Sequence, residues 1–219
     1  MAAEGKRGLI IGAAPWKDGA FLAPYLKGSQ WMVFCADGGY ANACTAGLRP
    51  DFLIGDWDSG SRPELDVPCV TLPVEKDMTD LQAAMDEALS MGISRLLLCG
   101  CTGGRLDHTM SNLLLLEWLA DRGGEGMIVD EDNEVRLLRP GSTRFEDDPH
   151  YHYLSLAPLD HKVSGVTLRG MKYPLECAEL TRGDTLSISN EPRQHVMEIT
   201  ITKGSALLIR SQREDKIPY

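Results

Sequence analysis

Residues 95–123 read RLLLCGCTGGRLDHTMSNLLLLEWLADRG, in which an apolar run, a glycine-rich connection and a helical pattern follow one another. The run 95–100 is short and apolar, which is typical of a buried strand. Residues 106–123 predict a helix that a glycine closes. A buried strand that leads into a helix indicates a mostly parallel α/β sheet.

The same alternation extends over the first two-thirds of the chain. Further buried strands are predicted at 8–12, 31–36, 51–55, 69–72 and 126–130. Residues 79–92 predict another helix, with Thr79 as its N-cap and Gly92 just past its end. We therefore expect an N-terminal α/β domain with a mostly parallel, Rossmann-like sheet and flanking helices.

The pattern changes after about residue 140. The stretch 139–151, RPGSTRFEDDPHY, is polar and rich in turn residues, and no long helical pattern follows it. Short β-type segments are predicted at 153–158, 163–170, 184–190, 195–202 and 205–211. This pattern favours an all-β domain, either an antiparallel sandwich or a small barrel, and we expect the sandwich. The expected domains are residues 1–140 and residues 141–219.

Composition limits the function further. The chain has 219 residues and a net charge of -10, which argues against binding of nucleic acid through a broad basic surface. Its six cysteines show no C-x-x-C spacing, and free thiols in a reducing compartment are the expectation. No apolar run approaches the length of a membrane span, and Pro15 interrupts the N-terminal apolar run too early for a signal peptide. We expect a cytoplasmic protein without a membrane partner.

Residues 52–60, FLIGDWDSG, place two acidic residues directly after a predicted strand. In an extended chain the side chains of Asp56 and Asp58 point to the same face, where their charges repel. A divalent cation is the first candidate to offset this repulsion. A solvated turn is the alternative.

Other predicted strands also end in unusual polar residues. The carboxyl ends of the strands are where open α/β sheets bind ligands. The residues found there are Asp37, Gly38 and Gly39; Asp77 and Asp80; and Gly103, Gly104, Arg105, Asp107 and His108. Each group alone has a structural interpretation, such as a turn at Asp37 or a first-turn acid at Asp80. Together they predict a site for a polyanion, in which carboxylates hold Mg²⁺, glycine backbone lies against phosphates and Arg105 neutralises charge.

These residues lie in blocks that resemble the signature blocks of the thiamine pyrophosphokinase family, in its bacterial form. The blocks are ADGGYANA (36–43), GLRPDFLIGDWDS (47–59), KDMTDLQAAMDEA (76–88) and GCTGGRLDHTMSNLLLL (100–116). The C-terminal block GMKYPLECAELTRGDTLSISNE (170–191) is similar to the thiamine-binding domain of that family. The resemblance runs in order over most of the chain and implies an α/β domain followed by a β-sandwich.

The resemblance implies transfer of a pyrophosphoryl group from ATP to the hydroxyethyl oxygen of thiamine, giving thiamine diphosphate and AMP. It implies Mg²⁺ at Asp56, Asp58 and Asp80, with catalytic roles for these residues and for Arg105. It places the nucleotide site at Asp37, Gly38, Gly39, Asn42, Asp77, Thr79, Arg105, Asp107 and His108. The general base stays open between Asp58 and Asp80.

For thiamine, the resemblance implies contacts from Ser187, Ser189 and Asn190 of the S-x-S-N segment. Tyr173 either stacks on thiamine or fills the sandwich core. The resemblance also implies a homodimer whose active sites combine residues of two chains. Two alternatives remain from the sequence: another Mg²⁺-dependent transferase that uses the Asp56/Asp58 pair, and a binding module without turnover. The Walker A and kinase glycine motifs are absent from the sequence.

Overall fold

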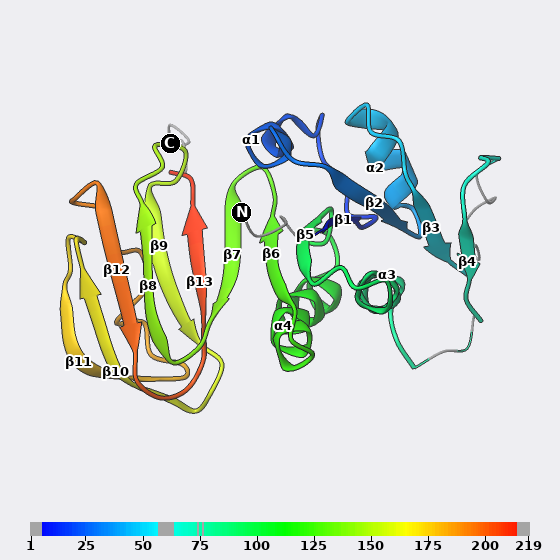
Figure 1. Cartoon of the computed structure of the whole chain (residues 1–219). Coiled ribbons are helices and arrows are strands. Elements are labelled where there is room, and N and C mark those ends of the chain that lie inside the picture. Colours follow the sequence, from blue (N-terminus) through cyan, green and yellow to red (C-terminus); the bar gives the residue numbers. More distant parts are fainter. Residues whose placement is uncertain (1–5, 57–63, 74, 76, 214–219) are drawn as a thin grey trace. The chain divides into compact units, whose positions relative to one another are not determined.

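The chain forms two compact units, Met1–Glu131 and Asp132–Tyr219, in a computed structural model that describes residues 6–56, 64–73, 75 and 77–213 (Figure 1). The division falls between Glu131 and Asp132, earlier than the boundary expected at 140/141. Strand β7 (Asn133–Leu138) explains this difference, because it pairs with β13 (Ala206–Ser211) of the second unit.

The first unit contains a parallel sheet with the strand order β4-β3-β2-β1-β5-β6. All the strands predicted in this part of the sequence are confirmed. Their bounds are β1 Arg7–Ile11, β2 Trp31–Ala36, β3 Phe52–Gly55, β4 Cys69–Thr71, β5 Arg95–Cys99 and β6 Glu125–Val129.

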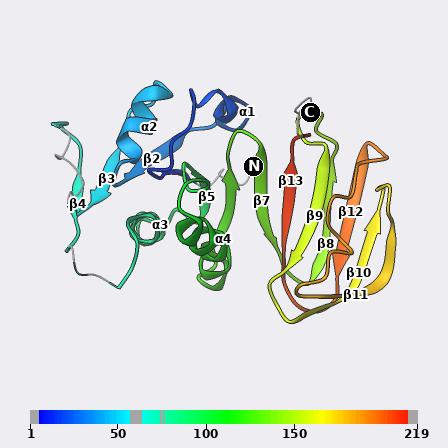
Figure 2. The same cartoon turned by 180° about the vertical axis from the view of Figure 1, so that it is seen from behind.

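Helices cover both faces of this sheet. The short η1 (Ala20–Leu22) and α1 (Ala23–Leu26) lie with α2 (Gly39–Thr45) on one face, and α3 (Asp80–Ser90) and α4 (Leu106–Asp121) lie on the other, as the views from front and back agree (Figures 1 and 2). Leu9 and Ile11 belong to the core under α1 and α2. Ile10 alternates with them and is equally buried, because strand side chains point to opposite faces. Burial on both faces explains the continuous apolar runs.

The two predicted helices are confirmed together with their ends. The hydroxyl of Thr79 caps α3 by accepting a hydrogen bond from the backbone N–H of Gln82, at 3.2 Å. Gly92 follows α3 with a φ of +76°, which glycine adopts at little cost. The pattern does not predict α2, since its inward residues are Gly39, Asn42 and Ala43 and give no apolar periodicity.

The second unit is a β-sandwich, as predicted. One sheet layer has the antiparallel order β7-β13-β9, with β9 at Tyr153–Pro158. The other has the order β11-β10-β12-β8, with bounds β8 Gly141–Glu146, β10 Lys162–Arg169, β11 Leu175–Thr181 and β12 Val196–Ile201. Side chains from both layers, among them Leu156, Val166, Ile199 and Leu208, form one buried core.

The sequence misses β7, β8 and β11 and wrongly assigns a strand to 184–190. Strands β8 and β11 are the two edges of their sheet and are largely exposed, so their sequences lack a clear apolar alternation. Residues 184–190 form turns instead, with one bridge from Asn190 to Leu154. Ser189 lies there with a φ of +57°, which a strand does not allow.

The cysteines agree with the expectation from the sequence. All six are free thiols, and Cys35, Cys99 and Cys101 are buried. Burial, and to a lesser extent the charge of Asp130, raises the pKa of Cys101 to about 12. Among the described residues, no helix is both long and apolar enough to cross a membrane.

Candidate active site

A cleft of about 490 Å³ opens in the first unit, at the carboxyl edge of its sheet. It is lined by the loops after β1, β2 and β5 and by the N-terminal turns of α3 and α4. Predicted site residues that line it are Asp37, Thr79, Asp80, Gly103, Gly104, Arg105 and His108. The structure thus gathers side chains from segments that lie far apart in the sequence.

The floor of the cleft depends on a close approach of two backbone segments. Gly12 after β1 and Gly100 after β5 face each other, and a Cβ on Gly100 would lie 2.5 Å from the carbonyl oxygen of Gly12. Gly100 also has a φ of +61°, a conformation that other residues rarely adopt. Glycine is therefore required here for both space and conformation.

Asn42 holds one of these loops from behind the cleft. Its side-chain amide donates to the carbonyl oxygens of Gly12 and Ala14, both at 2.8 Å, and the side chain is buried. Because both amide hydrogens are used, and because Asn42 is not among the lining residues, the structure gives it a supporting position. Gly38 and Gly39 lie at the start of α2, where Gly39 packs against the backbone of Ile11.

The acidic residues approach the cleft from several elements. Asp37 follows β2 with a φ of +48°, and Asp80 lies in the first turn of α3 with its Oδ1 atom buried. Asp56 directly follows β3 and is half-buried, while Asp77 is exposed just before α3. Asp58 lies outside the described residues.

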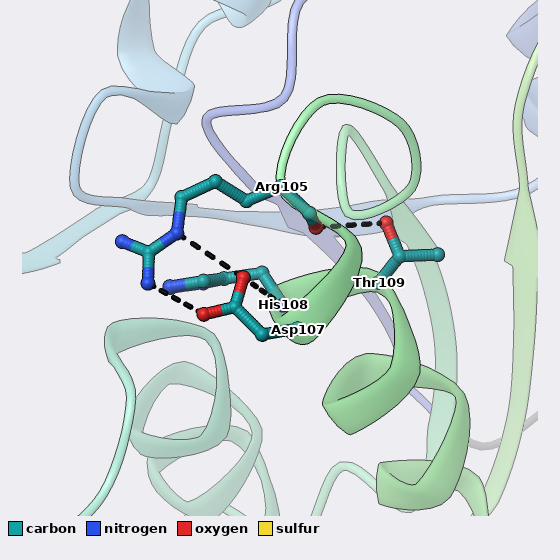
Figure 3. Close-up of polar contacts among 4 residues, drawn as sticks. All are labelled: Arg105, Asp107, His108 and Thr109. Carbon is teal, nitrogen blue, oxygen red and sulfur yellow. Dashed lines mark hydrogen bonds and ion pairs between the residues drawn. The ribbon is translucent and has the colours of Figure 1, made fainter.

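Arg105, which lines the cleft, forms an ion pair with Asp107 through two hydrogen bonds (Figure 3). The guanidinium donates from Nε at 3.2 Å and from Nη2 at 2.7 Å, and the backbone N–H of His108 donates to the same carboxylate at 2.9 Å. The hydrogen bonds from Arg105 lower the pKa of Asp107 to about 2, and the hydrogen bond from the backbone N–H of His108 makes a smaller contribution. The carboxylate therefore stays ionised at neutral pH, and the charge of Arg105 is held in one orientation.

Figure 3 also shows a hydrogen bond that stabilises the N-terminal turn of α4 next to this ion pair. The hydroxyl of Thr109 donates to the carbonyl oxygen of Arg105, at 3.2 Å. The side chain of Arg105 is largely exposed, so its guanidinium is accessible to an anionic ligand. The N-terminal turns of α3 and α4 add the positive ends of two helix dipoles.

The sequence reasoning misses Asn112. This residue lines the cleft one helical turn after His108, and its side-chain amide donates to the carbonyl oxygen of Cys101 at 2.7 Å. It is buried, although it stands beside a run of four leucines. A polar residue on the inner face of an apolar helix was the signal that could have revealed it.

The donor chemistry of the cleft fits Mg²⁺, which prefers oxygen ligands and binds through one or two carboxylates together with substrate phosphates. Asp80 lines the cleft, and Asp56 ends a strand on the same edge of the sheet. Within the described part of the chain, no three His, Cys, Asp or Glu side chains form a metal cluster on their own.

The predicted thiamine residues belong to the second unit, and two of them are engaged in its own hydrogen bonds. Ser187 is buried and donates to the carbonyl oxygen of Leu156 at 2.8 Å. Asn190 is buried, accepts from the backbone N–H groups of Tyr173 and Glu191 and donates to the carbonyl oxygen of Tyr173. By contrast, Tyr173 is 56% exposed, which excludes a place for its ring in the sandwich core.

Replacing Asn190 by alanine is expected to lower the free energy of unfolding by about 1–3 kcal/mol, because buried backbone groups lose their partners. The exposed neighbour Ser189 is the matched control, and Ser189→Ala should change stability by less than about 0.5 kcal/mol. Urea unfolding followed by circular dichroism measures both. Equal stability of Asn190→Ala and the unmodified chain would contradict the structural role of this side chain.

Comparison with known proteins agrees with this division of the chain. A family model described as the catalytic domain of thiamin pyrophosphokinase matches residues 23–126. A second, described as the vitamin B1 binding domain of thiamin pyrophosphokinase, matches residues 142–208. The two matches fall on the α/β unit and on the sandwich, respectively.

Relatives that match most of the chain belong to the same family. The thiamine pyrophosphokinase of Bacillus subtilis (strain 168) is 34% identical over 181 residues, which are 80% of this chain and 85% of that protein. A crystal structure of thiamine pyrophosphokinase from Bacillus subtilis matches with a TM-score of 0.85 at 29% identity, covering 94% of this chain and 99% of that one. One from Geobacillus thermodenitrificans matches with a TM-score of 0.83 at 33% identity, covering 95% and 99%.

Proposed function

Because the chain belongs to the thiamine pyrophosphokinase family, we propose that it transfers the pyrophosphoryl group of ATP to the hydroxyethyl oxygen of thiamine. The products are thiamine diphosphate and AMP. The observation that carries the proposal is the cleft of the first unit, where Asp80 and Arg105 meet the N-terminal turns of two helices.

In this proposal the cleft binds the triphosphate of ATP. The glycine-rich segment after β5 lets backbone N–H groups approach the phosphates, and the helix N-termini favour their negative charge. Arg105 neutralises charge on the transferred group, and Asp107 orients the guanidinium. Catalysis then rests on positioning and charge neutralisation.

We assign Mg²⁺ to Asp56, Asp58 and Asp80. When bound, the ion would neutralise phosphate oxygens and help to align the β-phosphorus with the attacking alcohol. These carboxylates would hold the ion. Asp58 or Asp80 accepts the proton of the alcohol as its oxygen bonds to the β-phosphorus, and the bond from the β-phosphorus to the α,β-bridging oxygen breaks, so that AMP leaves. The remaining predicted residues of the nucleotide site, Asp37, Asp77, Thr79 and His108, lie in or beside the loops that shape the cleft.

The direct test supplies the purified chain with ATP, Mg²⁺ and thiamine and identifies the products by mass spectrometry. Thiamine diphosphate and AMP should appear in equal amounts, and neither should form without thiamine. Formation of ADP would contradict pyrophosphoryl transfer, because ordinary kinases move the γ-phosphoryl group. Release of AMP without thiamine would favour a different Mg²⁺-dependent transferase.

For thiamine, we propose contacts from the exposed ring of Tyr173 and the hydroxyl of Ser189. Ser187 and Asn190 would shape this segment through their internal hydrogen bonds. An exposed aromatic ring offers a stacking surface to a planar heterocycle. The exposed apolar side chains Leu186 and Ile188 lie in the same segment, which supports its use in binding.

We propose further that the protein is a homodimer. Each active site would combine the cleft of one chain with the thiamine contacts, Tyr173 and Ser189, of the other chain. Exposed apolar side chains on both units support this arrangement. On α4 they lie four residues apart, at Leu106, Met110 and Leu114. Such spacing places them on one face of the helix, where a second chain would cover them.

Mixing two inactive variants tests the composite site. One chain carries Asp80→Asn, and the other carries Tyr173→Ala with Ser189→Asp. After unfolding and refolding together, half of the dimers should be mixed and contain one intact site each, so about a quarter of the original activity should return. Recovery no greater than the mean of the two parents would show that each site lies within one chain.

The free thiols also support the proposed cytoplasmic location, because a reducing compartment keeps buried cysteines in this state.

A further inference from the structure

Asp130 and Glu131 follow β6 directly and hold two loops that border the cleft. We propose that these two residues are positioning residues for the nucleotide, acting through the backbone that lines the cleft. The inference rests on the proposed function, since it takes the triphosphate of ATP to be the ligand of these loops.

The first tether joins Asp130 to the loop between β5 and α4. The hydroxyl of Thr102 donates to Oδ2 of Asp130 at 2.6 Å, a short distance that is typical of a charge-assisted hydrogen bond. Thr102 is not among the lining residues, but its neighbours Cys101 and Gly103 are. The bond therefore holds the loop from outside the cleft.

This loop needs such a restraint because of its composition. Gly100, Gly103 and Gly104 all have positive φ angles, and glycines lose much conformational freedom when they are ordered. The side-chain tethers of the loop include Thr102 to Asp130, Asn112 to the carbonyl oxygen of Cys101, and the hydroxyl of Thr109 to the carbonyl oxygens of Gly103 and Arg105. Of these, the bond to Asp130 joins the loop to the end of β6. A loop held before the ligand arrives loses less entropy when it binds.

The second tether joins Glu131 to the loop after β1. The backbone N–H of Lys17 donates to Oε1 of Glu131 at 2.7 Å, and this loop contributes Gly12 to Pro15 to the cleft. The two loops also contact each other, since the backbone N–H of Ala14 donates to the carbonyl oxygen of Gly100 at 2.8 Å. Asp130 and Glu131, which are consecutive in the sequence, thus each hydrogen-bond to one of two loops that also bond to each other.

The test compares variants that keep or remove the hydroxyl of Thr102. Thr102→Val preserves the shape but removes the donor, and Thr102→Ser keeps the donor. Calorimetry of Mg·ATP binding without thiamine should show a Kd about three- to tenfold higher for Thr102→Val and within about twofold of the original for Thr102→Ser. The KM for thiamine should stay unchanged in both. Glu131→Ala should weaken Mg·ATP binding in the same direction.

Two controls separate positioning from general stability. Thr45 has a hydroxyl bonded to the carbonyl oxygen of Ala41 on the exposed part of α2, and Thr45→Val should leave the Kd unchanged. In an Asp130→Asn background, adding Thr102→Val should change the Kd less than it does alone, because the two residues act through one bond.

An unchanged Kd for Thr102→Val would overturn the inference, as would a lower melting temperature without weaker nucleotide binding. Failure of the proposed function looks different, because the unmodified chain would then form no thiamine diphosphate from ATP and thiamine. An unmodified chain that bound no Mg·ATP would overturn the inference as well.

Discussion

Asp80→Asn is expected to reduce the formation of thiamine diphosphate by at least about a hundredfold. The substitution keeps the size of the side chain and removes its charge. Asp80 lines the cleft in the first turn of α3, where its carboxylate is assigned to Mg²⁺. Since Mg²⁺ binding depends on carboxylate charge, the loss should fall on turnover rather than on folding. Steady-state assays over a range of Mg²⁺ concentrations measure it.

The same helix supplies the control. Asp86 is exposed on α3 and is not among the residues of the cleft, so Asp86→Asn should leave the activity close to that of the unmodified chain. Both variants should keep a melting temperature near the original. Recovery of most activity by Asp80→Asn at saturating Mg²⁺ would refute the metal assignment of this residue.

Gly100→Ala should lower the free energy of unfolding by about 2–5 kcal/mol and abolish nucleotide binding. Two costs add at this position. A φ of +61° is unfavourable for alanine, and the new Cβ would lie 2.5 Å from the carbonyl oxygen of Gly12. Because that neighbour is backbone, the floor of the cleft must move. Urea unfolding gives the stability, and calorimetry with Mg·ATP gives the binding.

Gly92→Ala separates the two costs. Gly92 also has a positive φ, +76°, but nothing lies within 4 Å of a Cβ placed there. This variant should therefore lose only the conformational part, about 1–2 kcal/mol, and should bind nucleotide normally. If both variants lowered the free energy of unfolding by the same amount, the steric clash between a Cβ at position 100 and Gly12 would make no contribution to stability.

Much of the first unit was predictable because its signals are local. Burial on both sheet faces gives continuous apolar runs, and caps such as Thr79 mark helix ends within a few residues. The exposed edge strands β8 and β11 were not predictable, since a strand that faces solvent needs no apolar pattern. The pattern at 184–190 misled for a related reason, because Leu186 and Ile188 are apolar but exposed.

The candidate site divides in the same way. The order of the residues alone indicates the family, the strand ends that carry acids, and the glycine-rich connections. Only the tertiary structure shows which polar side chains are already engaged. Asn42 and Asn190 resemble ligands in the sequence, but their side-chain amides already donate within this chain. Asn42 donates to two backbone carbonyl groups, and Asn190 donates to the carbonyl oxygen of Tyr173 and the sulfur of Met171.

The partners of these side chains lie far away along the chain, as with Thr102 and Asp130, which are 28 residues apart. A residue type states what hydrogen bonds a side chain can make, and its neighbours in sequence influence the local backbone. Which partner it meets depends on how β-strands and loops come together, a property of the folded chain and not of any short segment.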